Sequence, residues 1–157
     1  MCDKLGLQAT TEAAVVMDSA LSLLQASRVD FTTFFYTLAN SVEGTGQELL
    51  ALFSSETSPV SGNNDSDAEQ WLADWRQSLE GEEQSLEGIS ASLRKTNPIN
   101  IPRLEAVEKA LDDANLGNME TFEALLAAVQ SPYEEREEWQ ELVAAGSMTA
   151  RRTFCET

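Results

Sequence analysis

The most chemically distinctive side chains lie near the carboxyl end of the sequence. Cys155 follows Phe154, and two arginines, Arg151 and Arg152, come shortly before it. A cysteine reacts as its thiolate, and positive charges that approach the thiol lower its pKa. We therefore take Cys155 as a candidate redox residue. The alternative is that these residues form an ordinary frayed tail.

A second candidate is a group of four cations around a pair of prolines, in a chain with only ten lysines and arginines. The four are Arg94, Lys95, Arg103 and Lys109. One interpretation is that each pairs with a surface carboxylate, an interaction that stabilises proteins little. The other is a rigid hinge that presents a cationic edge to a partner, because each proline holds the preceding residue in extended geometry. The sequence leaves both interpretations open.

Carboxylates are abundant, with 27 Asp and Glu, but their pattern does not indicate a catalytic centre. The densest group, residues 134–141, scatters five glutamates around a predicted helix instead of bringing them to one point. We interpret it as a solvated acidic face. Residues 63–67 are weakly similar to the start of a calcium loop, but the expected Gly and Glu at the sixth and twelfth positions are missing.

Composition excludes several classes of function. The chain has no histidine, which removes His-based triads and the common zinc and di-iron sites. It contains neither a GxxxxGK[ST] nor a GxGxxG motif, so we expect no nucleotide pocket and no cofactor in this chain. A net charge of −17 argues against binding nucleic acid or anionic lipid, since both attract Lys and Arg.

The chain also lacks the sequence features of a membrane or secreted protein. No apolar run approaches the 18 residues of a membrane span, and residues 1–7 lack the basic-then-apolar order of a secretory signal. Cys2 and Cys155 lie at opposite ends, which fits neither a disulfide framework nor a CxxC motif. We expect a soluble, cytoplasmic protein without a membrane partner.

Apolar residues recur with helical periodicity almost everywhere in the chain. This predicts an all-α fold of seven or eight short amphipathic helices in an irregular helical bundle, with residues 1–157 forming a single helical domain. A stretch rich in Ser, Thr, Pro, Gly and Asn predicts a flexible linker at about 54–66, after the third helix. An irregular tail is expected at about 146–157.

Local signals predict where several helices begin and which faces are buried. The expected starts are an N-cap at Thr10 or Thr11, N-caps at Asp30 and Asp67, a first turn at Pro102, and a last short helix from Pro132. The side chains expected to face inward in the two helices after Pro102 are Leu104, Val107, Leu111 and Ala114, then Phe122, Leu125, Leu126 and Val129. Trp71, Trp75 and Trp139 fit core packing first, with a binding hot spot as the alternative.

Short motifs in a fixed order give the chain a family resemblance. They are Lys4-Leu5-Gly6-Leu7, Asp30-Phe31-Thr32 with Phe35, Trp71-Leu72 with Trp75-Arg76, Asn97-Pro98 with Ile101-Pro102-Arg103 and Val107-Glu108, Phe122-Glu123 with Leu125-Leu126, Ser131-Pro132-Tyr133-Glu134-Glu135, and Thr153-Phe154-Cys155-Glu156-Thr157. In order and spacing, the chain resembles the carboxy-terminal helical region of the selenoprotein O (SelO/YdiU-type) family. The chain departs from the family pattern in two places: Leu104-Glu105 stands where Asn-His is usual, and Glu156 stands where a glycine is usual.

The resemblance implies a parent protein with a protein-kinase-like core that uses ATP and Mg or Mn to transfer AMP to protein hydroxyls. This chain would cover about its last third, and no residue here matches the family's catalytic, nucleotide-binding or metal-binding positions. Cys155 would correspond to the family's near-terminal cysteine or selenocysteine, which supports the redox interpretation. Glu156 beside it would raise the pKa of the thiol.

Two functions therefore stand side by side. In the first, the chain is a structural and regulatory domain whose intramolecular partner is the kinase-like core. The residues expected to make that interdomain contact are Asn97, Pro98, Ile101, Pro102 and Arg103. In the second, it is a free-standing acidic helical adaptor that binds other proteins through apolar grooves, with its charge steering it toward basic partners.

Overall fold

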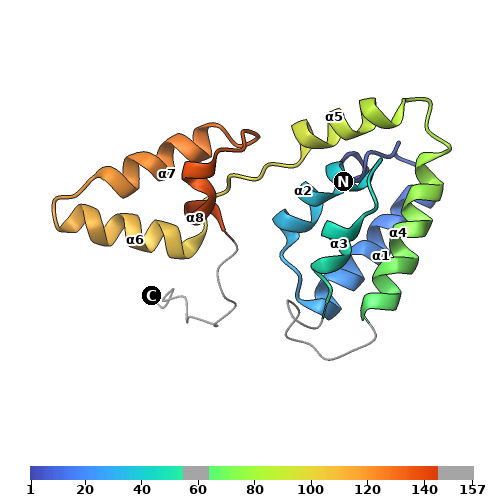
Figure 1. Ribbon diagram of the computed structural model, residues 1–157, viewed down its shortest axis with the longest axis horizontal. Coiled ribbons are helices and arrows are strands. Elements are labelled where there is room, and N and C mark those ends of the chain that lie inside the picture. The colour runs from blue at the N-terminus through green and yellow to red at the C-terminus, as the bar shows by residue number, and fades with distance from the viewer. Residues whose placement is uncertain (55–63, 145–157) are drawn as a thin grey trace. The chain divides into compact units, whose positions relative to one another are not determined.

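The chain folds into helices, which confirms the expected all-α class (Figure 1). The computed structural model describes residues 1–54 and 64–144. In these ranges it contains eight α-helices and two short 3₁₀ helices, η1 and η2, and no strand. The chain divides into two compact units, Met1–Ile99 (unit 1) and Asn100–Thr157 (unit 2). The single domain expected for residues 1–157 stays a prediction.

Unit 1 contains η1 and the first five α-helices. Their bounds are η1 Cys2–Leu5, α1 Thr11–Ser27, α2 Phe31–Ser41, α3 Gln47–Ala51, α4 Asn64–Leu79 and α5 Leu86–Thr96. Two expected N-caps are confirmed. The Thr10 hydroxyl accepts a hydrogen bond from the Ala13 amide at 3.1 Å, and the Asp30 carboxylate accepts one from the Thr33 amide at 2.8 Å. Each side chain satisfies an amide that the helix itself leaves unpaired.

The core of unit 1 is aromatic at its centre. Helix α1 packs against α4, α2 packs against α5, and η1 lies against α1, α2 and α5. Trp71 and Trp75 of α4 are buried and stacked with their rings 5.9 Å apart, and the buried Phe34 of α2 lies 5.2 Å from Trp71. The indole nitrogen of Trp75 donates to the Leu5 carbonyl at 2.9 Å. The interpretation of these tryptophans as core residues is confirmed.

Unit 2 is built on a helical hairpin. Its elements are α6 Leu104–Asn115, α7 Glu120–Gln130, η2 Glu137–Trp139 and α8 Gln140–Val143. A turn around Gly117 joins α6 to α7, and these helices pack against each other. The core cluster consists of Ala128, Trp139 and Val143, which joins the end of α7 to η2 and α8. Trp139 is thus a core residue as well, as expected.

Several helix boundaries and the buried faces of α6 and α7 differ from the prediction. Helix α4 begins at Asn64, before Asp67, and α6 begins at Leu104, two residues after Pro102. The helix expected from Pro132 is instead a turn, with helical structure resuming only at η2. Leu104 and Leu111 of α6 and Phe122 and Leu126 of α7 are exposed rather than inward. The buried residues of these two helices are Ala110, Leu125 and Ala128.

Two expected features fall largely or wholly outside the described residues. The flexible linker at about 54–66 falls mainly on 55–63, and the irregular tail falls on the final residues after 144. Both stay predictions. Within the described ranges, no helix has both the length and the apolar character needed to cross a membrane.

Candidate functional site

The double-proline segment, residues 97–103, is extended between α5 and α6. Asn97, the C-cap of α5, has φ −107° and ψ 100°, the extended geometry that a following proline imposes. The boundary between the two units falls inside this segment, after Ile99. Of the five residues expected to contact a partner domain, Asn97 and Pro98 belong to unit 1, and Ile101, Pro102 and Arg103 belong to unit 2.

Asn97 is buried and is used inside unit 1. Its amide nitrogen donates to the Lys4 carbonyl at 3.0 Å, and its amide oxygen accepts from the Lys4 ammonium at 3.3 Å. These reciprocal bonds tie the end of α5 to η1 across 93 residues of sequence. Asn97 therefore holds unit 1 together, with both the nitrogen and the oxygen of its amide group engaged.

Asn100 is the buried asparagine that binds backbone groups within unit 2, and it was not identified from the sequence. Its amide nitrogen donates to the carbonyls of Ser131 and Glu134, both at 2.7 Å, and its backbone amide donates to the Pro132 carbonyl at 3.1 Å. The side chain is buried. It fixes the Ser131–Glu134 turn, which explains why no helix starts at Pro132. A polar residue between two apolar neighbours and two prolines was the available signal.

The remaining predicted contact residues differ in accessibility. Pro98 and Ile101 are half-buried, and Pro102 is exposed. Arg103 is half-buried, and its guanidinium Nε donates to the Val143 carbonyl at 3.3 Å, next to the end of α8. Contact of this segment with another domain stays a prediction, and Pro102 is the member most available for it.

The four cations of the sequence cluster are divided between the two units. Arg94 donates to the Asn40 amide oxygen at 2.6 Å, which links α5 to α2, and Lys95 is exposed. Lys109 lines a groove in unit 2 with a volume of about 460 Å³, together with Arg103 and the glutamates Glu105, Glu120, Glu138 and Glu141. Arg94, Arg103 and Lys109 therefore lie near polar groups of their own units.

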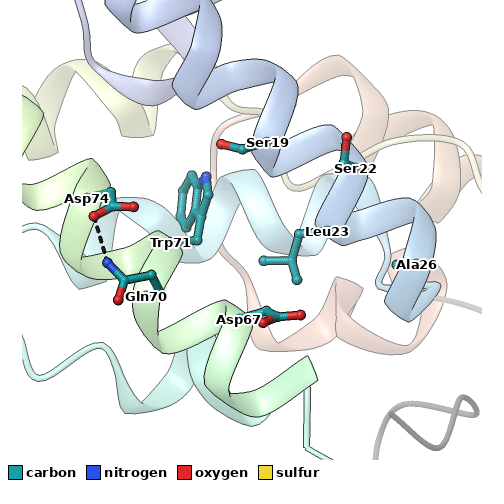
Figure 2. Close-up of a pocket in the computed structure, with 8 residues that line it drawn as sticks. All are labelled: Ser19, Ser22, Leu23, Ala26, Asp67, Gln70, Trp71 and Asp74. Atoms are coloured by element: carbon teal, nitrogen blue, oxygen red, sulfur yellow. Dashed lines mark hydrogen bonds between the residues drawn. The ribbon is translucent and has the colours of Figure 1, made fainter. Parts of the chain in front are cut away.

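A second groove lies between α1 and α4 in unit 1, with a volume of about 540 Å³ (Figure 2). Helix α4 contributes two carboxylates, Asp67 and Asp74, and Figure 2 shows Gln70 donating to Asp74, at 2.8 Å. The indole of Trp71 closes the side of the groove and donates to the Val16 carbonyl at 3.1 Å. No lysine or arginine of the described residues lines it.

The thiol chemistry expected at Cys155 lies outside the described residues. Cys2, the other cysteine, is half-buried and packs against the core of unit 1. Within the part of the chain that the structure describes, no group of three or more His, Cys, Asp or Glu is arranged to hold a metal ion.

A compact cluster at the end of unit 2 surrounds Arg136. Its guanidinium lies 4.4 Å from the centre of the Trp139 ring and contacts the carboxylates of Glu134 at 2.7 Å and Glu138 at 3.7 Å. The hydrogen bond that Arg136 donates to Glu134 is the largest of the effects that raise the pKa of Arg136. The cluster covers the core tryptophan and so has a structural role.

The motifs of the family resemblance also hold the fold. Gly6 adopts φ 71° and packs on α5, where it allows Leu5 and Leu7 to be buried on either side. Arg76 donates to the carbonyls of Ser41 and Gly44 at 2.8 and 2.6 Å, and so satisfies the end of α2. These motif residues are structural.

Most of the chain is similar in sequence to known proteins. Residues 1–130 match the family model described as Protein adenylyltransferase SelO. A protein of Mycobacterium sp. (strain KMS) named protein nucleotidyltransferase YdiU is 35% identical, in an alignment that covers 98% of this chain and 29% of the relative. The protein of the same name from Agrobacterium fabrum is 34% identical, with 100% and 31% covered.

A more distant relative with the same name, from Maridesulfovibrio salexigens, is 28% identical over 100% of this chain and 31% of its own length. The chain thus spans about 30% of the length of the curated relatives it matches. No solved structure gives a significant match. Because the family model covers most of the described residues, the chain belongs to the SelO family of protein adenylyltransferases.

Proposed function

We propose that this chain is the carboxy-terminal helical part of a SelO-type protein adenylyltransferase and is itself non-catalytic. The observation that carries the proposal is that a nearly full-length match to the family covers only about 30% of the relatives. The remainder of the parent protein, with a kinase-like core, would bind ATP and Mg or Mn and transfer AMP to protein hydroxyls.

The grooves of the described residues support a non-catalytic role. ATP carries a triphosphate, which proteins hold with cations and backbone amides at helix N-termini. The unit 1 groove instead has two carboxylates, Asp67 and Asp74, and no lysine or arginine among the described residues that line it. The unit 2 groove has two cations, but four glutamates line it as well. Both grooves are poorly suited to a polyphosphate.

The structural part of the proposal concerns residues 97–103. Asn97 and Asn100 anchor this segment to the two units, so its exposed atoms are held in a fixed conformation at each end. A fixed surface costs less conformational entropy on binding than a loose one. We assign Pro98 of unit 1 and Ile101 and Pro102 of unit 2 to contacts with the kinase-like core, while Asn97 and Arg103 are each bonded within their own unit.

A chimera tests the division of labour. The matched region of the Mycobacterium sp. (strain KMS) relative is replaced by this chain, and nucleotidyl transfer from labelled ATP to protein is measured with Mg²⁺ or Mn²⁺. We expect transfer by the chimera and none by the isolated 157-residue chain. Transfer by the isolated chain, or a folded chimera without activity, would contradict the proposal.

The second part of the proposal gives Cys155 a redox role, in a cytoplasmic protein whose thiols are kept reduced. The thiolate would attack one oxygen of hydrogen peroxide and break the O–O bond; sulfur would be oxidised by two electrons to a sulfenic acid, and the other oxygen would leave as hydroxide. Arginines held close to a thiol lower its pKa. If the folded chain holds Arg151 and Arg152 near Cys155, the thiol should react faster than in an unfolded peptide of the same sequence.

The thiol test uses a Cys2→Ser variant, so that Cys155 is the single thiol. We expect maleimide and peroxide to react with it faster than with the peptide, and the Arg151→Gln, Arg152→Gln pair to remove the difference. Equal rates for protein and peptide would leave the redox role without a physical basis.

A further inference from the structure

The α6–α7 hairpin carries an apolar face that the other elements of unit 2, as far as it is described (100–144), do not cover. Four of its side chains are large and well exposed, namely Leu104 (53%), Leu111 (53%), Phe122 (39%) and Leu126 (42%). Val107 and Val129 are half-buried beside them. We call these six residues the hairpin face.

Helical spacing places the six residues on one side of the hairpin. Leu104, Val107 and Leu111 follow i, i+3, i+7 in α6, and Phe122, Leu126 and Val129 follow i, i+4, i+7 in α7. The opposite side of the hairpin is occupied by η2 and α8, which line a groove with other residues of α6 and α7. No residue of the hairpin face belongs to that groove.

The amphipathic pattern is therefore typical of two helices that pack against each other and against a further apolar surface. Ala110 of α6 and Leu125 and Ala128 of α7 are buried inside unit 2, and the longer side chains of the hairpin face are left outside. Contiguous exposed apolar surface of this kind marks an interaction site, whereas single exposed apolar residues do not.

The charge of the chain restricts the occupant. Glu108 and Glu123 border the hairpin face in the sequence of each helix, and the chain has a net charge of −17. A second copy would bring two acidic borders together, which is unfavourable. The large exposed apolar side chains of the described part of unit 1 lie singly on separate elements, at Met1, Val15, Phe31 and Leu86. None of them matches the face in extent.

The length of the relatives indicates another candidate for the surface that covers the hairpin face. About 70% of a SelO-type protein lies outside the region matched by this chain. We propose that the hairpin face docks on an apolar surface bordered by Lys and Arg in that remainder, an inference that rests on the proposed function. The hairpin face would then be the main buried contact of unit 2 with the kinase-like core.

The experiment compares hydrogen exchange in the free chain and in the chimera described above. We expect the amides of α6 and α7 to exchange in the chimera at roughly one tenth of their rate in the free chain, or more slowly, because docking suppresses local opening. A Leu111→Lys, Leu126→Lys pair should abolish this protection and lower the Tm of the chimera, while leaving the Tm of the free chain unchanged. Val15→Lys, at another well-exposed apolar side chain, is the matched control and should change neither.

The outcomes separate the possible occupants. Equal exchange in the free chain and the chimera would overturn the inference. The inference would also be overturned if the free chain forms a dimer and the Leu111→Lys, Leu126→Lys pair dissociates it. That result would assign the hairpin face to a second copy of the chain. An equal loss of Tm in the free chain would assign it to this chain's own residues. The milder Leu111→Ser, Leu126→Ser pair repeats the test if the lysines unfold the hairpin.

Nucleotidyl transfer keeps the two proposals apart. An active wild-type chimera without protection of α6 and α7 removes the docking inference and leaves the proposed function in place. A folded, inactive chimera contradicts the proposed function, whatever the exchange rates are.

Discussion

Gly6 lies where η1 packs against α5, in a conformation that only glycine adopts readily. Its φ is 71°, and a Cβ added there would lie 2.6 Å from Cγ2 of Ile89. The left-handed conformation costs about 1–2 kcal/mol for other residues, and overpacking a core costs about 1–3 kcal/mol more. The Lys4–Leu7 motif thus has a steric reason, independent of any catalytic role.

Gly6→Ala should therefore lower the free energy of unfolding of unit 1 by about 2–5 kcal/mol. The matched control is Gly117→Ala, because Gly117 also has a positive φ, 88°, but nothing lies within 4 Å of its added Cβ. That control should cost unit 2 only about 1–2 kcal/mol. Urea unfolding followed by amide NMR signals of each unit measures both. Equal losses would show that the contact with Ile89 relaxes freely.

Residue-level prediction from the sequence succeeded for two local interactions. The caps at Thr10 and Asp30 bind amides three residues away, so the residue type and its position before an apolar stripe are enough. Asn97 and Asn100 bind carbonyls that are remote in sequence, and their roles depend on the fold. An asparagine near a proline is equally typical of an exposed turn.

At the scale of elements, Asn100 decides how the chain passes from α7 to η2. Its side chain satisfies two carbonyls of the Ser131–Glu134 turn from within the double-proline segment. Proline favours the first turn of a helix, which is why a helix was expected from Pro132. The buried asparagine competes successfully with that preference because it binds carbonyls on both sides of the turn.

Asn100→Ala should destabilise unit 2 by about 1–3 kcal/mol, since two carbonyls lose their partner in a place shielded from water. Asn115→Ala, at an exposed position at the end of α6, should have little effect. Urea unfolding followed by the α6 and α7 amide signals distinguishes the two variants. A matching, negligible change in both would mean that water replaces the Asn100 amide without cost.

The hairpin helices illustrate the other limit of pattern reading. Periodicity correctly identified apolar stripes in α6 and α7, but it could not tell which part of a wide stripe faces its own unit. The small residues Ala110 and Ala128 make the close contacts, and the larger Leu104 and Leu111 lie outside. Apolar residues that bind a partner and apolar residues that pack in a core recur with the same helical period.

On the scale of the whole molecule, the two units differ greatly in what they bury. The buried cluster of unit 1 has 21 apolar residues, including two tryptophans and three phenylalanines, whereas the described cluster of unit 2 has three. Composition and periodicity gave no sign of this asymmetry, because apolar residues are spread evenly along the chain. Apolar burial is the dominant favourable term in folding, so the units should differ in stability.

This difference predicts how the free chain opens. Native-state hydrogen exchange should give α6 and α7 amides an opening free energy below that of α1 and α4 amides, because unit 2 buries fewer apolar side chains. Trp139→Phe, which trims the unit 2 core, should lower the opening free energy of α6 and α7 alone. Trp75→Phe, which loses the bond to the Leu5 carbonyl, should lower that of α1 and α4. If either variant lowers the opening free energy of the amides of α1, α4, α6 and α7 equally, the two units open together, as expected for a single domain over residues 1–157.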